Sequence, residues 1–472
     1  MLSQRDDPII ALATPPGRGA VGVVRLSGKN MQGFAQELTH ATLTPRVAKL
    51  LSIKDPHGNP IDQVLAIFFP APHSYTGEDV LELQAHGGPV VLQMLLQNCL
   101  QRAQQTNTKN QALLPCLRLA RPGEFTERAY LNHKLDLAQA EAVADLIDAH
   151  TEAAVRSAGR SLEGVFSSQV HALKDLLVHL RMQIEACLDF PEEDIDFIQQ
   201  MQVSEQLQTL QQKTRELLLQ AEHGRLLRDG LKLVIAGQPN AGKSSLLNAL
   251  SGADVAIVTA IAGTTRDVLT QSIQIQGVPV HVLDTAGLRE SALADEVEQI
   301  GMARAWDQIG NADMVLLLND LSRENEPQYV EAQLRLSKDI QQAMSAHTQL
   351  LVVNNKADAM TPHAVLNPHV LNISAKTGDG LDQLKARILE MAGWQAGLNE
   401  GVFTARTRHL DALQAVLSHL QQARQLMSLA AVPLDLMAEE CRLAQSQLSL
   451  LTGNYSPDDL LGEIFSRFCI GK

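Results

Sequence analysis

One short segment limits the possible folds of this chain more than any other. Residues 237–244 read Gly-Gln-Pro-Asn-Ala-Gly-Lys-Ser and fit the pattern G-x-x-x-x-G-K-[ST]. An apolar run of strand type at 231–236 precedes the segment, and a helix-like run at 245–250 follows it. In such a strand–loop–helix unit, glycines let backbone N–H groups turn toward phosphate oxygens, and the helix N-terminus adds partial positive charge. The segment therefore predicts a phosphate-binding loop (P-loop).

The region around the P-loop alternates short apolar runs with helix-like segments. The runs are at 231–236, 280–283, 314–318, 350–354 and 370–373. Runs of this length without polar alternation are typical of buried parallel strands. We therefore expect a Ras-like α/β domain over about 230–393.

Four further motifs follow the P-loop in the order that a guanine-nucleotide site requires. They are Gly-Thr-Thr-Arg-Asp at 263–267, Asp-Thr-Ala-Gly at 284–287, Asn-Lys-Ala-Asp at 355–358 and Ser-Ala-Lys at 374–376. We expect Lys243 to neutralise phosphate oxygens and Ser244 to ligate Mg²⁺. Thr265 would add a second hydroxyl to Mg²⁺, and Asp284 would act through water. The residues predicted to bind nucleotide are Asn240, Ala241, Gly242, Lys243, Ser244, Ser245, Thr259, Thr264, Thr265, Asp284, Thr285, Ala286, Gly287, Asn355, Lys356, Ala357, Asp358, Ser374, Ala375 and Lys376.

Asp358 predicts the choice of base. Its carboxylate can accept hydrogen bonds from both N1–H and the 2-amino group of guanine. Adenine lacks this donor pair and would leave a buried carboxylate unpaired, which is a costly mismatch. We therefore expect GTP rather than ATP.

The residue after the Asp-Thr-Ala-Gly motif is unusual for a GTP-hydrolysing enzyme. Ras-like enzymes place a water-orienting Gln there, and this chain has Leu288, which cannot position water. Hydrolysis would need another polar group, another ion or a partner. The following segment is rich in carboxylates, including Glu290, Asp295, Glu296 and Glu298, most of which we expect on a solvated helix face.

The parts outside the α/β region have two different textures. Residues 1–122 mix strand-like runs at 21–26 and 64–69 with turns and one expected helix at 90–100, which predicts a compact α+β domain. Beyond that, an apolar stripe from 166 to 188 at spacings of three and four predicts a long helix. A second helix is expected over 203–222 with a stop at Gly224, and helical texture returns after 407. The simplest architecture is a helical domain in two parts, 123–229 and 394–472, with the α/β domain inserted.

Composition narrows the classes of partner. The net charge of −14 makes the chain a poor general binder of nucleic acid, so any RNA contact must be local or shared with a partner. Five cysteines without a close pair suggest reduced thiols. The first residues lack a basic start and a long apolar run, and no apolar stretch approaches about 20 residues. We expect a soluble, cytoplasmic protein.

Longer strings resemble the MnmE (TrmE) family, a branch of the Era/EngA-type GTPases that acts in tRNA modification. They are ATPPGRGAVGVVRLSG at 13–28, YTGEDVLELQAHGG at 75–88, RPGEFTERAYLNHKLDLAQAEA at 121–142 and FCIGK at 468–472. The resemblance implies an N-terminal tetrahydrofolate-binding domain, a discontinuous helical domain and an inserted GTPase domain. It also implies a homodimer formed through the N-terminal domains, and the FAD-dependent partner MnmG (GidA). Together they would modify C5 of the wobble uridine (position 34) of certain tRNAs to carboxymethylaminomethyl- or aminomethyluridine, with folate supplying the one-carbon unit.

The resemblance also implies site residues. Folate contacts would be Arg25, Glu82, Lys134 and Lys472, although an ordinary surface ion-pair set fits the same residue types. K⁺ would be held by Asn240, Thr259, Ile261 and Thr264; the alternative for Asn240 is a residue that only shapes the turn. The stretch 290–296 is about two residues longer than usual in the family, and alignment on 297–301 makes Glu298 the catalytic residue that acts through water. Cys469 has either a chemical role near folate or a plain packing role.

Two other functions remain open from the sequence. One is a ribosome-assembly switch of the Era/EngA type, although the KH-type appendage of those proteins is not evident in the chain. The other is a regulatory scaffold in which GTP cycling moves the helical domain without chemistry.

Overall fold

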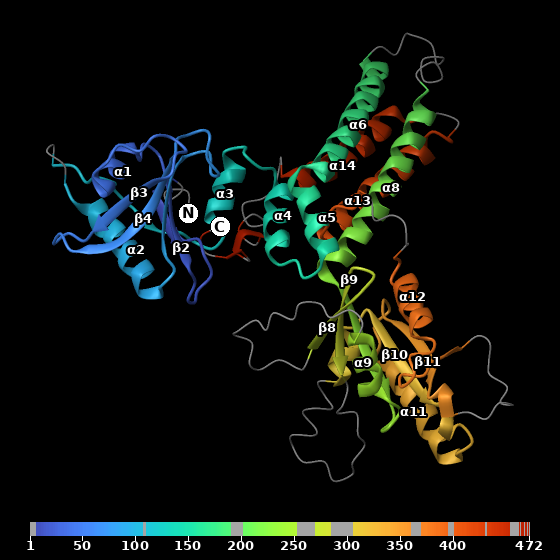
Figure 1. Cartoon of the computed structure of the whole chain (residues 1–472). Coiled ribbons are helices and arrows are strands. Elements are labelled where there is room, and N and C mark those ends of the chain that lie inside the picture. The colour runs from blue at the N-terminus through green and yellow to red at the C-terminus, as the bar shows by residue number, and fades with distance from the viewer. Residues whose placement is uncertain are drawn as a thin grey trace. The chain divides into compact units, whose positions relative to one another are not determined.

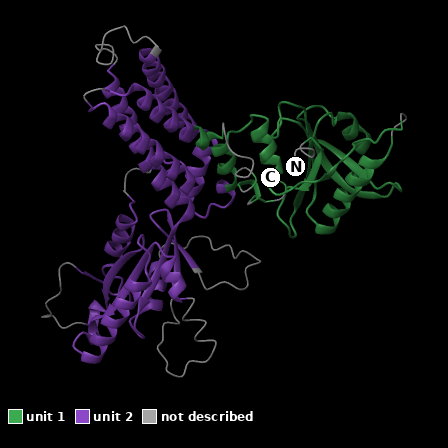
Figure 2. Ribbon diagram, turned by 180° about the vertical axis from the view of Figure 1, so that it is seen from behind, with its two compact units in different colours: residues 1–144, 449–472 green, residues 145–448 purple. Residues whose placement is uncertain are grey.

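The computed structural model describes residues 6–106, 110–189, 202–252, 270–284, 305–359, 370–394, 401–429 and 432–453, together with 462, 464–466, 468, 469 and 471. The chain forms two compact units (Figure 2). The first comprises residues 1–144 and 449–472, and the second comprises residues 145–448. The four-domain division of the sequence stays a prediction.

The first unit contains a six-stranded sheet in the order β3-β4-β5-β2-β1-β6 (Figure 1). Only β1 and β6 pair in parallel. The strands are β1 (Ile9–Leu12), β2 (Val21–Gly28), β3 (Lys49–Lys54), β4 (Pro60–Phe69), β5 (Asp79–His86) and β6 (Arg118–Leu119). The helices beside them are α1 (Gln32–Thr39) and α2 (Pro89–Gln104). The strands expected at 21–26 and 64–69 and the helix expected at 90–100 are confirmed, whereas β1, β3, β5 and α1 were not predicted.

Side chains alternate along these strands, so the two faces of the sheet carry different residues. Leu26, Leu81 and Leu83 are buried in one cluster with Phe34 of α1 and Leu95 of α2. Arg25, next to Leu26, and Glu82, between Leu81 and Leu83, are directed to the opposite face. The first face forms the main core of the unit, whereas the opposite face carries these charged groups together with a small buried apolar cluster of Ile9, Ala11, Ala120 and Phe125.

Two further helices and the C-terminal segment complete the first unit. Helix α3 (Glu124–Leu131) leads to α4 (Leu137–Ile147), whose residues beyond 144 belong to the second unit. Leu137 is buried with Phe465 and Phe468 from the end of the chain. A Cβ at Gly123 would lie 2.5 Å from the carbonyl oxygen of Phe465, so only glycine permits this approach. The C-terminal segment is therefore an integral part of the N-terminal unit.

The second unit contains helices on both sides of its α/β part in the chain. They are α5 (Glu152–Leu162), α6 (Val165–Asp189), α8 (Val203–Asp229), α13 (Thr407–Leu426) and α14 (Leu434–Thr452), whose residues beyond 448 belong to the first unit. The apolar stripe predicted on α6 is confirmed from Phe166 to Ile184, which are buried, whereas its last member, Leu188, is exposed. Helix α8 packs against both α6 and α13, which joins segments on either side of the α/β region.

The stop predicted at Gly224 is wrong, because α8 continues to Asp229. Gly224 is buried, and a Cβ there would lie 1.9 Å from the carbonyl oxygen of Phe403. The glycine permits close approach of the 403–405 backbone rather than ending the helix.

The α/β part of the second unit is a six-stranded sheet in the order β12-β11-β10-β7-β9-β8. All neighbours pair in parallel except β8 and β9. The strands are β7 (Leu231–Gly237), β8 (Thr270–Ile275), β9 (Val278–Asp284), β10 (Met314–Asp320), β11 (Gln349–Asn355) and β12 (Leu371–Asn372). Five of them were predicted, and β8 was not.

Helices cover both faces of this sheet. Leu233 and Ile235 are buried with residues of α9 (Lys243–Ser251) and α12 (Leu381–Met391). Val234 and Ala236 are buried on the other face with Ile340 of α11 (Pro327–Ala343). Burial on both faces explains the unbroken apolar runs of the sequence, and it confirms a mixed α/β fold with a P-loop domain.

Candidate functional site

The P-loop connects β7 to α9 through backbone conformations that few side chains allow. The φ angles of Gly237, Asn240 and Gly242 are 156°, 65° and 93°. A Cβ at Gly242 would lie 2.3 Å from Nδ2 of Asn355, and a Cβ at Gly237 would lie 2.9 Å from the carbonyl oxygen of Leu318. The two glycines of the motif are therefore required by this geometry.

Lys243 lies back across the loop that precedes it. Its Nζ donates to the carbonyl oxygens of Gly237 at 2.8 Å and Gln238 at 3.2 Å. Ser244 and Ser245 follow in the first turn of α9 and are exposed. The loop and the first turn of α9 thus carry an ammonium, two exposed hydroxyls and the unpaired N–H groups of a helix N-terminus, and this donor set fits a phosphate chain.

Asn355 joins three segments of the predicted site. Its Nδ2 donates to the carbonyl oxygen of Ala241 in the P-loop at 2.8 Å, and its Oδ1 accepts from the N–H of Ala375 at 3.0 Å. The side chain is buried at the end of β11. One amide therefore fixes the P-loop, the Asn-Lys-Ala-Asp motif and the Ser-Ala-Lys motif relative to one another.

Asp358 is exposed, with one oxygen already positioned. Oδ1 accepts from the buried Oγ of Ser374 at 2.6 Å. This hydrogen bond, with the nearby charges of Lys376 and Lys356, lowers the pKa of Asp358 below its ordinary value. The carboxylate is therefore ionised at neutral pH and accessible, as pairing with a guanine edge requires.

Asp320 belongs to this site and was missed by the sequence reasoning. Its Oδ2 accepts from Nζ of Lys356 at 2.6 Å. Burial alone would raise the pKa of Asp320, but hydrogen bonds from Lys356 and Ser322 outweigh burial and lower it. A signal was available, because Asp320 ends a buried apolar run just as Asp284 does.

Several predicted residues lie outside the described part of the chain. They are Thr259, Ile261, Thr264, Thr265, Thr285, Ala286, Gly287, Glu298 and Lys472. Asp284 ends β9 beside Ile235 of β7, so its backbone stands next to the strand that carries the P-loop. Among the described residues, no three His, Cys, Asp or Glu side chains gather as metal ligands. The Mg²⁺ and K⁺ sites therefore stay predictions.

A second group of predicted residues lies on the first unit. Arg25 of β2 and Glu82 of β5 are direct cross-strand neighbours, and Nε of Arg25 donates to Oε1 of Glu82 at 2.8 Å. The guanidinium carbon lies 5.8 Å from the ring centres of both Tyr75 and Phe125. Nη1 also donates to the carbonyl oxygen of Gly471 at 3.5 Å, which brings the C-terminal motif to the same place.

Lys134 contacts the loop that carries Tyr75. Its Nζ donates to the carbonyl oxygen of Pro72 at 3.1 Å, and Asn132 donates to that of Thr76 at 2.7 Å. The carbonyl oxygen of Cys469 accepts from the N–H of Gly123 at 3.4 Å. Cys469 itself is exposed. Segments 72–77 and 123–134 and residues 469 and 471 thus belong to one group of contacts, to which Arg25 is joined through Tyr75, Phe125 and Gly471.

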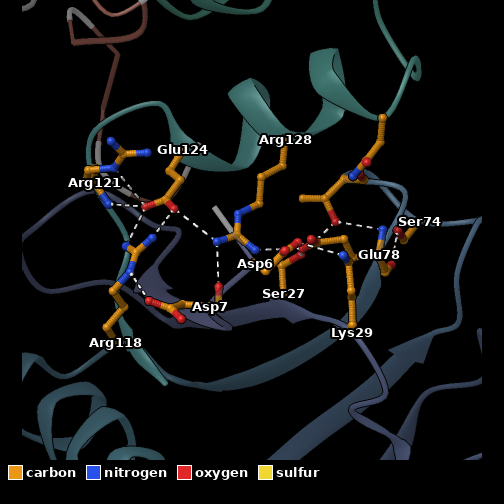
Figure 3. A network of polar contacts seen from close by, with 12 residues as sticks. Asp6, Asp7, Ser27, Lys29, Ser74, Glu78, Arg118, Arg121, Glu124 and Arg128 are labelled. Atoms are coloured by element: carbon orange, nitrogen blue, oxygen red, sulfur yellow. Dashed lines mark hydrogen bonds and ion pairs between the residues drawn. The ribbon is translucent and has the colours of Figure 1, made fainter. Parts of the chain in front are cut away.

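A buried ion network holds these segments in place (Figure 3). Arg128 of α3 donates to Glu78 at 2.9 Å and to Glu124 at 3.0 Å, and none of the three side chains is more than 8 % exposed. Ser27 of β2 donates to Glu78 at 2.8 Å. Burial alone would raise the pKa of Glu124, but hydrogen bonds led by that from Arg118 lower it to about 2. The network fixes α3 and the loop before β5 against β2, beside Arg25.

No helix in the described ranges is long and apolar enough to cross a membrane.

Comparisons with known proteins cover the whole chain. A model of the MnmE helical domain matches residues 137–469, and a model of the GTP-binding protein TrmE N-terminus matches residues 8–134. A tRNA modification GTPase MnmE from Methylibium petroleiphilum is 57% identical over 475 residues, and one from Acidovorax sp. is 57% identical over 477 residues; both alignments cover 100% of each chain. Among solved structures, Era from Aquifex aeolicus with bound GDP and AlF4⁻ is 27% identical over 40% of this chain and 66% of its own, with a TM-score of 0.27.

The two family models together span nearly all of the chain, and the relatives match it from end to end. The chain therefore belongs to the MnmE family of tRNA modification GTPases.

Proposed function

We propose that this chain binds GTP between the P-loop and Asp358 and hydrolyses it in the course of tRNA modification. The observation that carries the proposal is Asn355, whose buried amide contacts both Ala241 and Ala375. It holds a phosphate-binding segment and a base-binding segment in fixed register, and full-length relatives carry the name tRNA modification GTPase.

Different described residues would bind the phosphates and the guanine base. Lys243 would exchange its carbonyl partners for the β- and γ-phosphate oxygens, because a charged partner is stronger than a neutral one. The first turn of α9 supplies N–H donors, and Asp358 supplies the acceptor pair for guanine. Lowering of its pKa keeps Asp358 ionised and so able to accept both hydrogen bonds.

Two metal ions fit the donors of this chain. Ser244, exposed beside the phosphate position, and Thr265 would ligate Mg²⁺, with Asp284 acting through water. Asn240, Thr259, Ile261 and Thr264 offer side-chain or backbone oxygens for K⁺, which would supply positive charge beside the bond that breaks. Glu298 would orient the attacking water, a role that Leu288 cannot fill.

The tRNA chemistry is assigned to the first unit. We propose that Arg25, Glu82, Lys134 and Lys472 bind tetrahydrofolate, which would supply a one-carbon unit. The support is chemical: a carboxylate and guanidinium pair, with two aromatic rings near the guanidinium, suits a flat, polar ring system. The chain would act as a homodimer together with the FAD-dependent MnmG (GidA) to modify C5 of the wobble uridine. Cys469, exposed close to this group, is a further candidate residue.

Nucleoside analysis of tRNA tests the proposal. A strain lacking the gene is complemented with the chain, with Lys243→Ala or with an empty vector. We expect carboxymethylaminomethyl- or aminomethyluridine at position 34 only with the unchanged chain. Normal modified uridine in the deletion strain, accompanied by a defect in ribosome assembly, would favour the Era/EngA-type switch instead.

A further inference from the structure

A buried carboxylate stands between the two strands that carry the nucleotide motifs. The sheet order places β10 between β7, which leads into the P-loop, and β11, which leads into the Asn-Lys-Ala-Asp motif. Asp320 is the last residue of β10 and lies in register with Asn355. Only 2 % of its side chain is exposed. A charge at this position is costly unless it is paired.

The surroundings of Asp320 fix its carboxylate and direct one oxygen at Lys356. Oδ1 accepts from the N–H of Ser322 at 3.0 Å and from its Oγ at 2.6 Å. The N–H of Asp320 donates to the hydroxyl of Tyr329 at 2.7 Å, which fixes the backbone. Oδ2 accepts from Nζ of Lys356 at 2.6 Å. The carboxylate is therefore a rigid anchor for that lysine.

This anchor determines the course of the Lys356 side chain. Lys356 has a φ of 66°, an uncommon conformation for a residue with a Cβ. From the end of β11 its ammonium reaches across to the end of β10, in the direction of β7. In the chain, Lys356 lies between Asn355, which contacts the P-loop, and Asp358, so the stem that this contact fixes begins between the two ends of the proposed site. Of the Lys356 side chain, 35 % remains exposed, so part of it is accessible to a ligand.

We propose that Asp320 is a positioning residue for guanine-nucleotide recognition, which holds the stem of Lys356 extended as one wall of the base and ribose site. The inference rests on the proposed GTP function. Asp320 does not itself touch the nucleotide. It acts by removing the rotamer freedom that a free lysine would lose on binding.

This role predicts a specific pattern of effects. The phosphate contacts come from Lys243 and α9, which Asp320 does not touch, so bond cleavage is unaffected by its loss. Binding of the nucleoside half is weakened, and GTP and GDP are affected equally. The expected result is a higher KM for GTP with unchanged kcat.

The test compares Asp320→Asn, Lys356→Met and the double variant in the full chain. Affinity is measured by GDP titration, and kcat and KM by steady-state GTP hydrolysis. Each single variant should weaken GDP binding about tenfold, and the double variant no further, because both changes remove the same wall. Tyr329→Phe removes the hydroxyl that accepts from the N–H of Asp320 and keeps Lys356 anchored on the carboxylate, so it should bind GDP like the unchanged protein.

The outcomes separate the two proposals. If the unchanged protein binds no GDP or GTP, the proposed function itself fails. If it binds both and Asp320→Asn binds equally well, the positioning role is overturned, as it is by effects of the two single variants that simply add. If Asp320→Asn does not fold, Lys356→Met decides, and unchanged affinity in that variant overturns the role.

Discussion

The hydroxyl of Thr151 donates a 2.9 Å hydrogen bond to the carbonyl oxygen of Gly277, which joins the N-terminus of α5 to the turn between β8 and β9. The same hydroxyl accepts from the N–H of Ala154 at 3.1 Å and so caps α5. A Cβ at Gly277 would lie 3.0 Å from that of Ala153. Since β9 ends at Asp284, the helices of the second unit hold one end of a hairpin whose other end carries a residue predicted to act at the nucleotide site.

The first prediction concerns this contact. Thr151→Val removes both hydrogen bonds at nearly constant volume and should lower the free energy of unfolding by about 1–2 kcal/mol. Thr151→Ser keeps the hydroxyl and should retain most of that stability. Urea unfolding and hydrogen exchange of β8, β9 and α5 provide the measurement. Equal behaviour of the two variants would show that the hydroxyl contributes nothing.

The second prediction is a pH dependence of stability. The pKa of Glu124 falls from its ordinary 4.5 to about 2 in the folded chain. Because the folded pKa is the lower one, its stabilising effect is complete above pH 4.5 and is lost as the pH falls toward 2. The free energy of unfolding should therefore fall between these values.

A matched variant isolates this effect. Glu124→Gln removes the titrating group, so its unfolding free energy should fall less over the same pH range. At neutral pH it should be about 3–5 kcal/mol less stable, because Arg128 and Arg118 lose a buried partner. Parallel pH profiles for the two proteins would contradict the assignment.

The fold could be predicted where the periodicity of the sequence was undisturbed. The buried strands of the α/β part and the stripe of α6 were found from apolar runs alone. Strand β8 was missed because it is an edge strand with only Ile273 and Ile275 buried. Gly224 was misread because a glycine inside a helix looks like a stop until the packed backbone of Phe403 is known.

The site could be predicted where residues act through local motifs. Asn355 links the motifs through hydrogen bonds to the P-loop and to the Ser-Ala-Lys motif, and Asp358 is exposed rather than buried, while their binding of guanine stays a prediction. The anchor at Asp320 depends on the strand order, which places β10 between β7 and β11, and no local pattern shows that. The approach of Gly471 to Arg25 joins residues 446 positions apart in the chain, so only the fold reveals it.

The third prediction tests the guanine contact. Asp358→Asn replaces two acceptors by one acceptor and one donor, so GTP affinity should fall on the order of 100-fold while xanthosine triphosphate binds better. Asp379→Asn, a change of an exposed carboxylate on the loop of the Ser-Ala-Lys motif, should leave both affinities unchanged. Competition titrations provide the measurement. Undiminished GTP affinity in Asp358→Asn would remove this residue from the guanine site.

The fourth prediction concerns folate. A reduced folate should bind the chain without nucleotide, and Arg25→Ala should weaken it about tenfold or more. Arg25→Lys keeps the charge but loses the planar guanidinium that lies near Tyr75 and Phe125, so it should restore only part of the affinity. Calorimetry on the unchanged chain with no heat of folate binding would refute the assignment of the first unit.

The last prediction concerns hydrolysis without the usual Gln. Charge that develops between the β- and γ-phosphates needs stabilisation, which an arginine finger supplies with a rate gain of about 10³–10⁵. If K⁺ at Asn240 supplies it, hydrolysis should be on the order of tenfold or more faster in K⁺ than in Na⁺ at equal ionic strength. Equal rates in the two salts would exclude the cation.

Asn240 offers a sharp control for this mechanism. Its φ of 65° suits glycine equally well, so Asn240→Gly keeps the turn and removes only the side-chain oxygen. This variant should bind GTP normally and lose the preference for K⁺, whereas a residue that only shapes the turn would leave the preference intact. Glu298→Ala should likewise bind GTP and lose turnover, while Glu296→Ala should do much less. The reverse result would move the water-orienting role from Glu298 to Glu296, two positions earlier. The cation mechanism would then still be tested by Asn240→Gly.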